Sequence, residues 1–553
     1  MFRKTDTSPQ LSLYSSVSQH LSGSAFRQFT SETGWHNAFY KQVVGRIDEN
    51  LFSKLFSSDQ GSPNASIRIL IGMMILKEGE GYSDQKLFEN CNFNLLTRKA
   101  LGLVNIDDSL PAESTYYLLR KRITDYHKET GIDLFESCFK KITEEQIIEI
   151  EVSGQSIRMD SKLIGSNIAF YSRYELIHST LMLFYKHVYK KQIKFLSEQD
   201  RIVLDEFIKE KSAVIVYRST KTQITERLML LGKLIYTILN TVKENNSIHY
   251  QTLKRVFEEQ YKVLDDNKIE LIPSKEIAAK SIQSPHDTEC DFRLKNNKKT
   301  KGYNHNLTET CDSSNAVNLI TDVQTAPATH PDNEFSKPAI ENSQKILSDK
   351  IKDVHTDGAY NSEANQTFTK EEDINFYLTG FQGPSGRYDL SIQNNEVQVF
   401  DNHTNTQMAV TLTKNNKYRI KTEKGFRYFT DKQIESCRLR KQVEELPKEI
   451  RNKRNNVEAT IFQLAYHLRK DKTKYRGNFK NKIWAILRSL WINFVRIAKN
   501  IANIRQKTKV NVNNILHLEV LVNFSTIFLI LTCLESYKKI KLNFIKKLIF
   551  TPF

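Results

Sequence analysis

The segment Ser156–Asp160 reads SIRMD and alternates apolar with polar residues, with both apolar side chains on one face. This alternation predicts a half-buried β-strand that ends at Asp160. A second segment, Asp353–Tyr360 (DVHTDGAY), places Asp357 directly before a glycine, at the end of another predicted strand. Two strands far apart in the chain, each ending in an aspartate, are the starting point for the expected fold.

Helical and strand-like segments alternate around these two strands. Further strand patterns occur at 302–307, 317–323 and 374–378. A helical stretch at 338–347 separates two of them, and strands alternating with helices predict a mixed α/β layer architecture. The sequence is helical from about 172 to 263, and from 387 to 429 it alternates in the β manner between Asn-rich turns, which predicts a small antiparallel insert.

The first 150 residues are predicted to form a helical domain. Apolar residues at helical spacing follow Ile67, and Gly79–Gly81 ends that helix. A later helix opens after Pro111 with Ser114 or Thr115 as its N-cap, and it carries the basic residues Arg120, Lys121 and Arg122. Short helices with a basic last member are typical of helix-turn-helix readers, and an ordinary bundle with a charged outer face fits equally well.

The net charge of the chain is +17 and its pI is near 9.3. A protein this basic usually meets a polyanion, most commonly nucleic acid, with an anionic membrane surface as the competing partner. The only segment apolar enough for a membrane span, Val520–Leu534, is short and contains polar residues, so a buried terminal helix is expected there instead. No signal peptide is expected.

The six cysteines are scattered singly, without a CxxC pair. This pattern argues against a zinc site and against a disulfide framework. Reduced thiols in a cytosolic protein are expected.

Three carboxylates stand out as candidates for metal chemistry. Asp160 and Asp357 lie where strands are predicted to end, the edge at which α/β sheets place ligands, although an aspartate there is often only a turn or cap residue. Glu458 lies at the edge of an apolar helical stripe made of Val457, Ile461, Leu464, Ala465 and Leu468. A carboxylate there needs a partner, and Arg454, four residues earlier, could supply a simple ion pair as readily as a metal could.

Together these motifs are similar to those of bacterial insertion-sequence transposases of the DDE type, which have an RNase H-like catalytic domain. The resemblance covers most of residues 50–500. It is carried by Ile157–Lys162, Lys301–Asn304, His355–Tyr360, Arg454–Glu458 and the trailing Lys474–Gly477. The order of strand, strand, strand and helix is more specific than any single motif. The family also has a β insert between the second aspartate and the glutamate, which 387–429 matches.

The resemblance implies that Asp160, Asp357 and Glu458 bind catalytic metal, Mg²⁺ or Mn²⁺, and that Arg454 contacts DNA phosphate. The implied reaction is cleavage of transposon ends and their joining to target DNA by metal-dependent hydrolysis and strand transfer. The implied partners are double-stranded DNA and a second copy of the chain, without a membrane, in the bacterial cytoplasm at the nucleoid. A catalytically inactive DNA-binding relative and a metal-dependent nuclease remain as alternatives.

The sequence departs from the family signature at two positions. Arg451 and Ala465 stand where the family has a tyrosine and a lysine. The lysine role is therefore unassigned, with Lys470 or Lys472 as possible substitutes.

Further DNA contacts are expected from basic stretches with interleaved aromatic residues. One follows Lys472, and another runs from Arg293 to Lys301; a solvated helical face or loop is the alternative for each. The predicted DNA-binding residues are Arg454, Lys301, Tyr303, Arg120, Arg122, Lys474, Tyr475, Arg476 and Lys480. The predicted organisation is an N-terminal helical DNA-end-binding domain (1–150), a first core strand (151–170), a helical insertion (171–280), the RNase H-like core (281–380), a β-rich insert (381–435), the catalytic helix with a basic helical region (436–510) and a tail (511–553).

Overall fold

The computed structural model describes residues 1–5, 16–188, 196–242, 246–265, 268–380, 386–393, 396–413 and 415–519. The apolar segment Val520–Leu534, with Cys533 in it, lies outside these residues, so the terminal helix expected there stays a prediction. Within the described ranges, no helix is long and apolar enough to cross a membrane. The described cysteines are free, and all except Cys437 are buried.

The N-terminal region is helical, as predicted. Its elements are η1 (Val17–His20), α1 (Gly23–Thr30), α2 (Trp35–Gln42), η2 (Val44–Arg46), η3 (Glu49–Leu55), α3 (Ile67–Glu80), α4 (Asp84–Phe93), α5 (Leu95–Ala100), α6 (Glu113–Thr130) and α7 (Leu134–Glu149). Helix α3 ends at Gly81, which takes the left-handed conformation (φ 69°) that glycine tolerates best. The prediction that Ser114 or Thr115 caps α6 is wrong. The helix begins at Glu113, and its N-cap is Ala112, which has no capping side chain.

The central sheet is mixed and has six strands. They are β1 (Ser156–Gly165), β4 (Asp291–Lys295), β5 (Lys298–Thr310), β6 (Ile320–Pro327), β7 (Asp353–Thr356) and β8 (Asn375–Leu378). The order is β4-β5-β1-β7-β8, with β6 paired to the second half of β5. Strand β1 is antiparallel to β5 and parallel to β7, and β7 is parallel to β8. The predicted fold class, a mixed α/β sheet flanked by helices in the RNase H-like manner, is confirmed.

One strand boundary differs from the prediction. Strand β1 continues to Gly165, because its pairing with β5 goes on after its pairing with β7 has ended at Arg158. Asp160 therefore lies in the middle of a strand, and the prediction that it ends one is wrong. Asp357 does follow the last residue of β7, Thr356.

Helices cover both faces of this sheet. On one face, Met159 packs in a cluster with Ala339 of α13 (Ser336–Gln344). On the other, Leu307 packs in a cluster with Leu464 of α16 (Lys448–Ala465) and Trp484 of α17 (Asn478–Glu519). The short elements η7 (Asp332–Phe335) and η8 (Gly358–Tyr360) contact each other, and α14 (Glu363–Glu371) contacts the edge strand β8.

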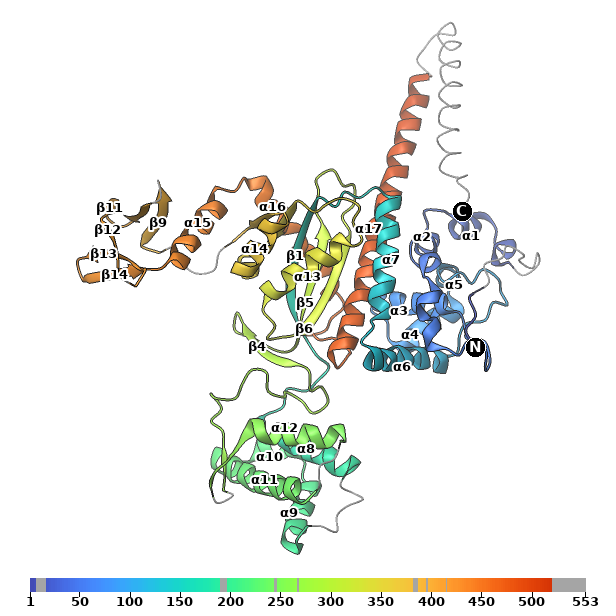
Figure 1. The fold of residues 1–553 in the computed structure, drawn as a ribbon. Coiled ribbons are helices and arrows are strands. Elements are labelled where there is room, and N and C mark those ends of the chain that lie inside the picture. Colours follow the sequence, from blue (N-terminus) through green and yellow to red (C-terminus); the bar gives the residue numbers. More distant parts are fainter. Residues whose placement is uncertain are drawn as a thin grey trace.

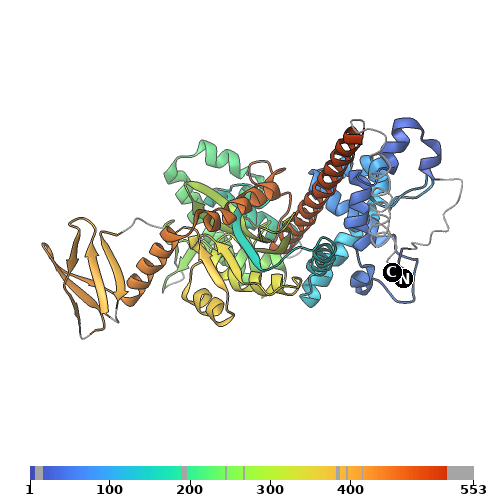
Figure 2. The same ribbon diagram turned by 90° about the horizontal axis from the view of Figure 1, so that it is seen from above.

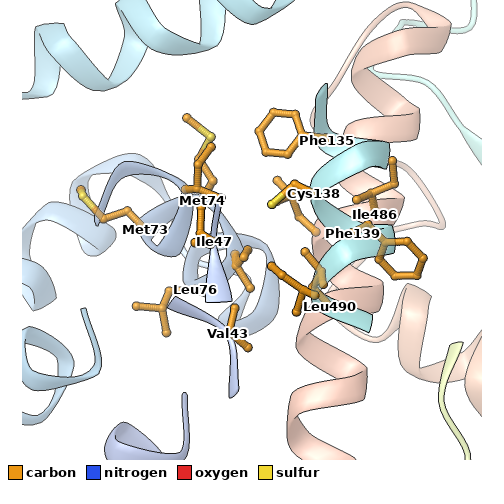
Figure 3. Packing of buried hydrophobic residues seen from close by; sticks show 14 of the residues in the cluster. Val43, Ile47, Met73, Met74, Leu76, Phe135, Cys138, Phe139, Ile486 and Leu490 are labelled. Atoms are coloured by element: carbon orange, nitrogen blue, oxygen red, sulfur yellow. The ribbon is translucent and has the colours of Figure 1, made fainter. Parts of the chain in front are cut away.

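The second face shares its core with the N-terminal helices. Figure 3 shows Val43, Met74, Phe139 of α7 and Leu490 of α17 packed together, and all belong to the same buried cluster as Leu307. Figure 1 shows α17 between the sheet and the N-terminal helices. The N-terminal region and the sheet are thus joined by one hydrophobic core.

A helical insertion leaves the sheet after β1 and returns before β4. It contains α8 (Arg173–His187), α9 (Glu198–Lys209), α10 (Ser212–Arg218), α11 (Lys221–Thr241), α12 (Ile248–Gln260) and a hairpin of β2 (Tyr261–Val263) and β3 (Ile269–Leu271). The insertion has a hydrophobic core of its own, which includes Phe184, Leu231 and Leu253. In Figure 1 its helices lie apart from the sheet.

A second insertion, between β8 and α16, is β-rich. Its strands are β9 (Tyr388–Gln393), β10 (Glu396–Asp401), β11 (Thr406–Met408), β12 (Val410–Leu412), β13 (Tyr418–Thr422) and β14 (Gly425–Phe429), and α15 (Asp431–Glu445) follows them. They form two three-stranded antiparallel sheets around Leu390, Val399 and Ile420. Figures 1 and 2 show these sheets at the end of an arm that includes α15.

Candidate active site

The two aspartates come together because β1 and β7 are parallel neighbours. Arg158 pairs with His355, so Asp160 and Asp357, each two residues further on, stand side by side at the point where β7 ends. Asp160 Oδ1 accepts a hydrogen bond from the Ser161 amide at 2.8 Å. Asp357 also caps η8 by accepting a hydrogen bond from the Ala359 amide at 2.9 Å. The role of a cap residue, considered from sequence as an alternative, is therefore present.

Helix α16 brings the third carboxylate to the same place. Val457 and Leu464 are fully buried, which confirms the apolar stripe, and the helix lies against β1. The Glu458 side chain is 62% exposed, so it faces solvent more than the sequence predicted. The three carboxylates come from a strand, a strand end and a helix that are remote in the sequence.

One guanidinium stands among these carboxylates. Arg454 Nη2 lies 3.4 Å from Asp160 Oδ2, 3.8 Å from Asp357 Oδ2 and 3.5 Å from Glu458 Oε1. The ion pair with Glu458, considered from sequence as an alternative to a metal site, is therefore formed, and the same nitrogen also meets both aspartates. A single positive charge faces three carboxylates.

Burial dominates the electrostatics of the site. The Asp160 side chain is 15% exposed, and burial raises the pKa of its carboxyl to about 6. The Arg454 charge and the Ser161 amide act against that rise in pKa, while Asp357 and Glu458 add to it. The charge on Asp160 is therefore favoured by a cation nearby.

The residues fit a divalent cation by their chemistry. All three side chains offer the oxygen ligands that Mg²⁺ prefers, and with one guanidinium their formal charge is about −2, which favours a further cation. Within the described part of the chain, no three His, Cys, Asp or Glu side chains are already spaced to share a metal ion. Metal binding would therefore require Arg454 to yield its place among the carboxylates.

Two residues predicted to bind DNA on β5 lie away from the carboxylates. Asp160 pairs with Leu307 and Gly165 with Gly302, so Tyr303 and Lys301 are about 13 and 20 Å along the strand from the level of Asp160. Tyr303 is fully buried and its hydroxyl donates to Asp287 at 2.7 Å, so it does not lie at the surface of this structure, and its contact with DNA stays a prediction. Lys301 is half-buried, and desolvation lowers the pKa of its ammonium group.

Two arginines of α6 turn toward the protein. Arg120 lies over the rings of Tyr116 and Tyr475, at 5.6 and 5.7 Å, and Arg122 lies 5.0 Å from the ring of Phe56. Both guanidinium groups contact aromatic rings of the protein. This favours a helical bundle with a charged outer face over a DNA-recognition helix that presents these two arginines.

The stretch after α16 is mixed in exposure. Lys474, Arg476 and Lys480 are exposed, with Lys474 donating to the Tyr82 carbonyl and Arg476 to the Asn167 carbonyl. Tyr475 instead turns inward, where its hydroxyl bonds the buried Glu78.

Neither possible substitute for the family lysine lies among the carboxylates. Lys472 donates to the Ile168 carbonyl at 2.8 Å, and its chain neighbour Asp471 accepts from the Gly165 amide at the far end of β1. Lys470 is exposed two residues earlier. The lysine role stays unassigned.

Sequence reasoning missed a set of residues directly behind the carboxylates. Arg158, Glu309, Thr460 and Arg496 form a buried polar cluster between β1, β5, α16 and α17. The only local signal was Glu309, a charged residue in a strand whose other residues near it are uncharged.

Comparison with known proteins identifies the N-terminal region. The chain matches no curated protein and no solved structure. Residues 30–122 match the family model described as "Transposase domain (DUF772)", a segment that runs from the end of α1 into α6. Over this segment the N-terminal region is similar to a transposase domain.

Proposed function

We propose that the protein is a DNA transposase of the DDE type, and that Asp160, Asp357 and Glu458 form its catalytic centre. The observation that carries this proposal is the approach of three carboxylates, from two strands and a helix, to within 3.8 Å of one guanidinium nitrogen. Three like charges are held together only where a cation, such as a guanidinium or a metal ion, offsets their repulsion. The transposase domain at residues 30–122 supports this choice over other phosphodiester chemistry.

The three carboxylates would hold Mg²⁺ or Mn²⁺. When bound, such ions activate the attacking water or 3′-hydroxyl and stabilise the leaving oxygen of a phosphodiester. Asp160 lies on β1 and Asp357 directly follows the neighbouring β7, whereas Glu458 comes from α16 and is more exposed.

Arg454 has two roles in this proposal. In the absence of DNA its charge offsets part of the negative charge of the carboxylates. With DNA present, its planar group can donate to a phosphate oxygen beside them, since guanidinium matches phosphate geometry. The Arg454 guanidinium can change from the carboxylates to a phosphate by movement of its side chain alone.

Double-stranded DNA is the proposed partner, and two copies of the chain would bring two transposon ends together at the nucleoid. The exposed cations Lys474, Arg476 and Lys480, together with Lys301, are proposed to contact the phosphate backbone. Such contacts would position the duplex without reading its sequence.

The test is an excision and integration assay with the gene in its native flanks, paired with cleavage of the same flanks by purified protein in Mg²⁺ or Mn²⁺. Asp357→Asn should abolish both, while Asp353→Asn, at the start of the same strand, should leave both intact. Equal activity of Asp357→Asn and the wild type would overturn the site. Cleavage without joining would indicate a nuclease, and DNA binding without cleavage an inactive relative.

A further inference from the structure

Glu309 is a fully buried carboxylate that receives hydrogen bonds from three side chains. Arg158 donates to its Oε1 through Nε at 2.7 Å and lies 2.6 Å away through Nη2. Thr460 and Arg496 each donate to Oε2 at 2.7 Å. The four residues, here called the Glu309 cluster, come from β5, β1, α16 and α17, so one carboxylate joins two strands and two helices.

The cluster holds α16 on both sides of its two functional residues. Arg158 Nη1 donates to the carbonyl of Lys453, at 2.6 Å, one residue before Arg454. Thr460 binds Glu309 two residues after Glu458. On the strand, Arg158 is two residues before Asp160 and on the same face. The contacts thus bracket Arg454 and Glu458 and start from the strand that carries Asp160.

A third anchor comes from the long helix behind the site. Arg496 of α17 donates to Glu309, to Thr460 and to the Asn318 carbonyl, the last at 3.0 Å. Burying charged groups is costly unless every donor and acceptor is matched, and both Glu309 oxygens are matched here. A cluster of this kind has one low-energy arrangement, and it therefore fixes how far α16 is rotated and shifted along the sheet.

We propose that the Glu309 cluster positions Glu458 and Arg454 against Asp160, so that Arg158, Glu309, Thr460 and Arg496 are positioning residues of the catalytic centre. This inference rests on the proposed function. It follows from geometry, because a shift of about 1 Å in α16 would separate Glu458 from the aspartates, and displacements of that size can lower rates by about 100-fold.

Thr460→Val is the decisive variant, because valine keeps the shape of threonine and removes only the hydroxyl. Replacing Glu309 itself would leave two buried arginines unpaired and could prevent folding. Thr321→Val is the matched control: Thr321 is equally buried, and its hydroxyl lies 2.8 Å from Ser343 Oγ on the opposite side of the sheet. Thr460→Ser, which restores the hydroxyl, is the rescue variant.

Two quantities are measured on the full-length protein: kcat and KM for cleavage of flank DNA, and the Kd for Mn²⁺ by electron paramagnetic resonance. Thr460→Val should lower kcat about 10- to 100-fold and weaken Mn²⁺ binding several-fold, with KM within about twofold. Thr460→Ser should recover most of both, and Thr321→Val should change neither, although both valine variants lose a similar amount of thermal stability.

The outcomes separate this inference from the proposed function. If the wild type cleaves DNA and Thr460→Val matches it in kcat and Mn²⁺ affinity, the positioning role is wrong and the function stands. If Thr321→Val is impaired as much as Thr460→Val, the effect is general destabilisation and the positioning role is again wrong. If the wild type neither cleaves DNA nor binds Mn²⁺, the proposed function fails and this inference fails with it.

Discussion

The guanidinium of Arg454 lies 3.4 Å from the carboxylate of Asp160, although 294 positions separate the two residues in the chain. The same nitrogen is within 3.8 Å of Asp357 and Glu458. A side chain in this position holds the carboxylates together and at the same time occupies the space nearest their negative charge. Its two effects can be separated by experiment.

Arg454→Gln should raise the affinity for Mn²⁺ by about three- to tenfold and lower the rate of DNA cleavage by at least tenfold. Removing a positive charge about 3.5 Å from three carboxylates strengthens their attraction for another cation, while the phosphate loses its guanidinium donor. Mn²⁺ titration and a cleavage assay on the same preparations measure the two effects.

Arg451→Gln is the control for this charge, since Arg451 is exposed and donates only to backbone carbonyls around Glu444. It should alter neither quantity. Weaker Mn²⁺ binding in Arg454→Gln would mean that the guanidinium organises the carboxylates more than it competes with the metal.

Tyr303→Phe should reduce stability and leave DNA affinity unchanged. The Tyr303 hydroxyl donates to the buried Asp287, and loss of a hydrogen bond to a carboxylate costs about 1–3 kcal/mol. Urea unfolding and fluorescence anisotropy with duplex DNA measure the two quantities. Tyr428→Phe, at an exposed position of the β-rich insert, serves as the neutral reference. A drop in DNA affinity without a loss of stability would restore Tyr303 as a DNA contact.

Replacing Lys474, Arg476 and Lys480 together by glutamine should weaken duplex binding and flatten its dependence on salt. Each lost phosphate contact reduces the slope of log K against log salt by about 0.9. Three exposed cations of the helical insertion, Lys211, Arg218 and Lys221, give a control of equal charge. An unchanged slope in the first variant would place the duplex on a different surface.

Asp322→Asn should stabilise the protein at pH 8 and not at pH 5. Asp322 is buried on β6, and burial raises the pKa of its carboxyl to about 7. A raised folded-state pKa means that this group's contribution to stability is complete below pH 4 and is lost as the pH rises through 7.

The asparagine variant avoids that loss, so its advantage in unfolding free energy should grow with pH, by roughly 1.4 kcal/mol per unit of pKa shift at most. Urea unfolding at both pH values measures it, with the exposed Asp107→Asn as reference. Equal destabilisation of the variant at both pH values would mean that the hydrogen bond from Gln324 to the Asp322 carboxylate contributes more to stability than burial of the charge costs.

Local patterns were sufficient for β1, β5, β6, β7 and β8 and for the helix that carries Glu458, because alternation and helical spacing depend only on neighbouring residues. They did not predict β4 or the hairpin of β2 and β3. They failed where long-range pairing decides. Asp160 was expected to end a strand, but antiparallel pairing to β5 carries β1 on to Gly165. Tyr303 was predicted to contact DNA, yet its side chain is buried with Ile168 and Cys290 and its hydroxyl binds Asp287.

The site itself was only partly accessible from sequence. Asp160, Asp357 and Glu458 were singled out by resemblance, and the structure brings all three to Arg454. The partners of Glu309 could not be inferred, because Arg158 and Arg496 are about 150 and 190 residues from it and nothing local links them.

The core that α17 shares with α3 and α7 limits how the chain can be divided. Met74, Phe139 and Leu490 bury one another, so a protein fragment starting at residue 151 would expose a large hydrophobic surface of α17 to water. Such a truncation should aggregate, and exchange of the first 150 residues between related proteins would need matched partners on α17. The N-terminal helices and the sheet with the candidate site therefore fold as one unit rather than as interchangeable modules.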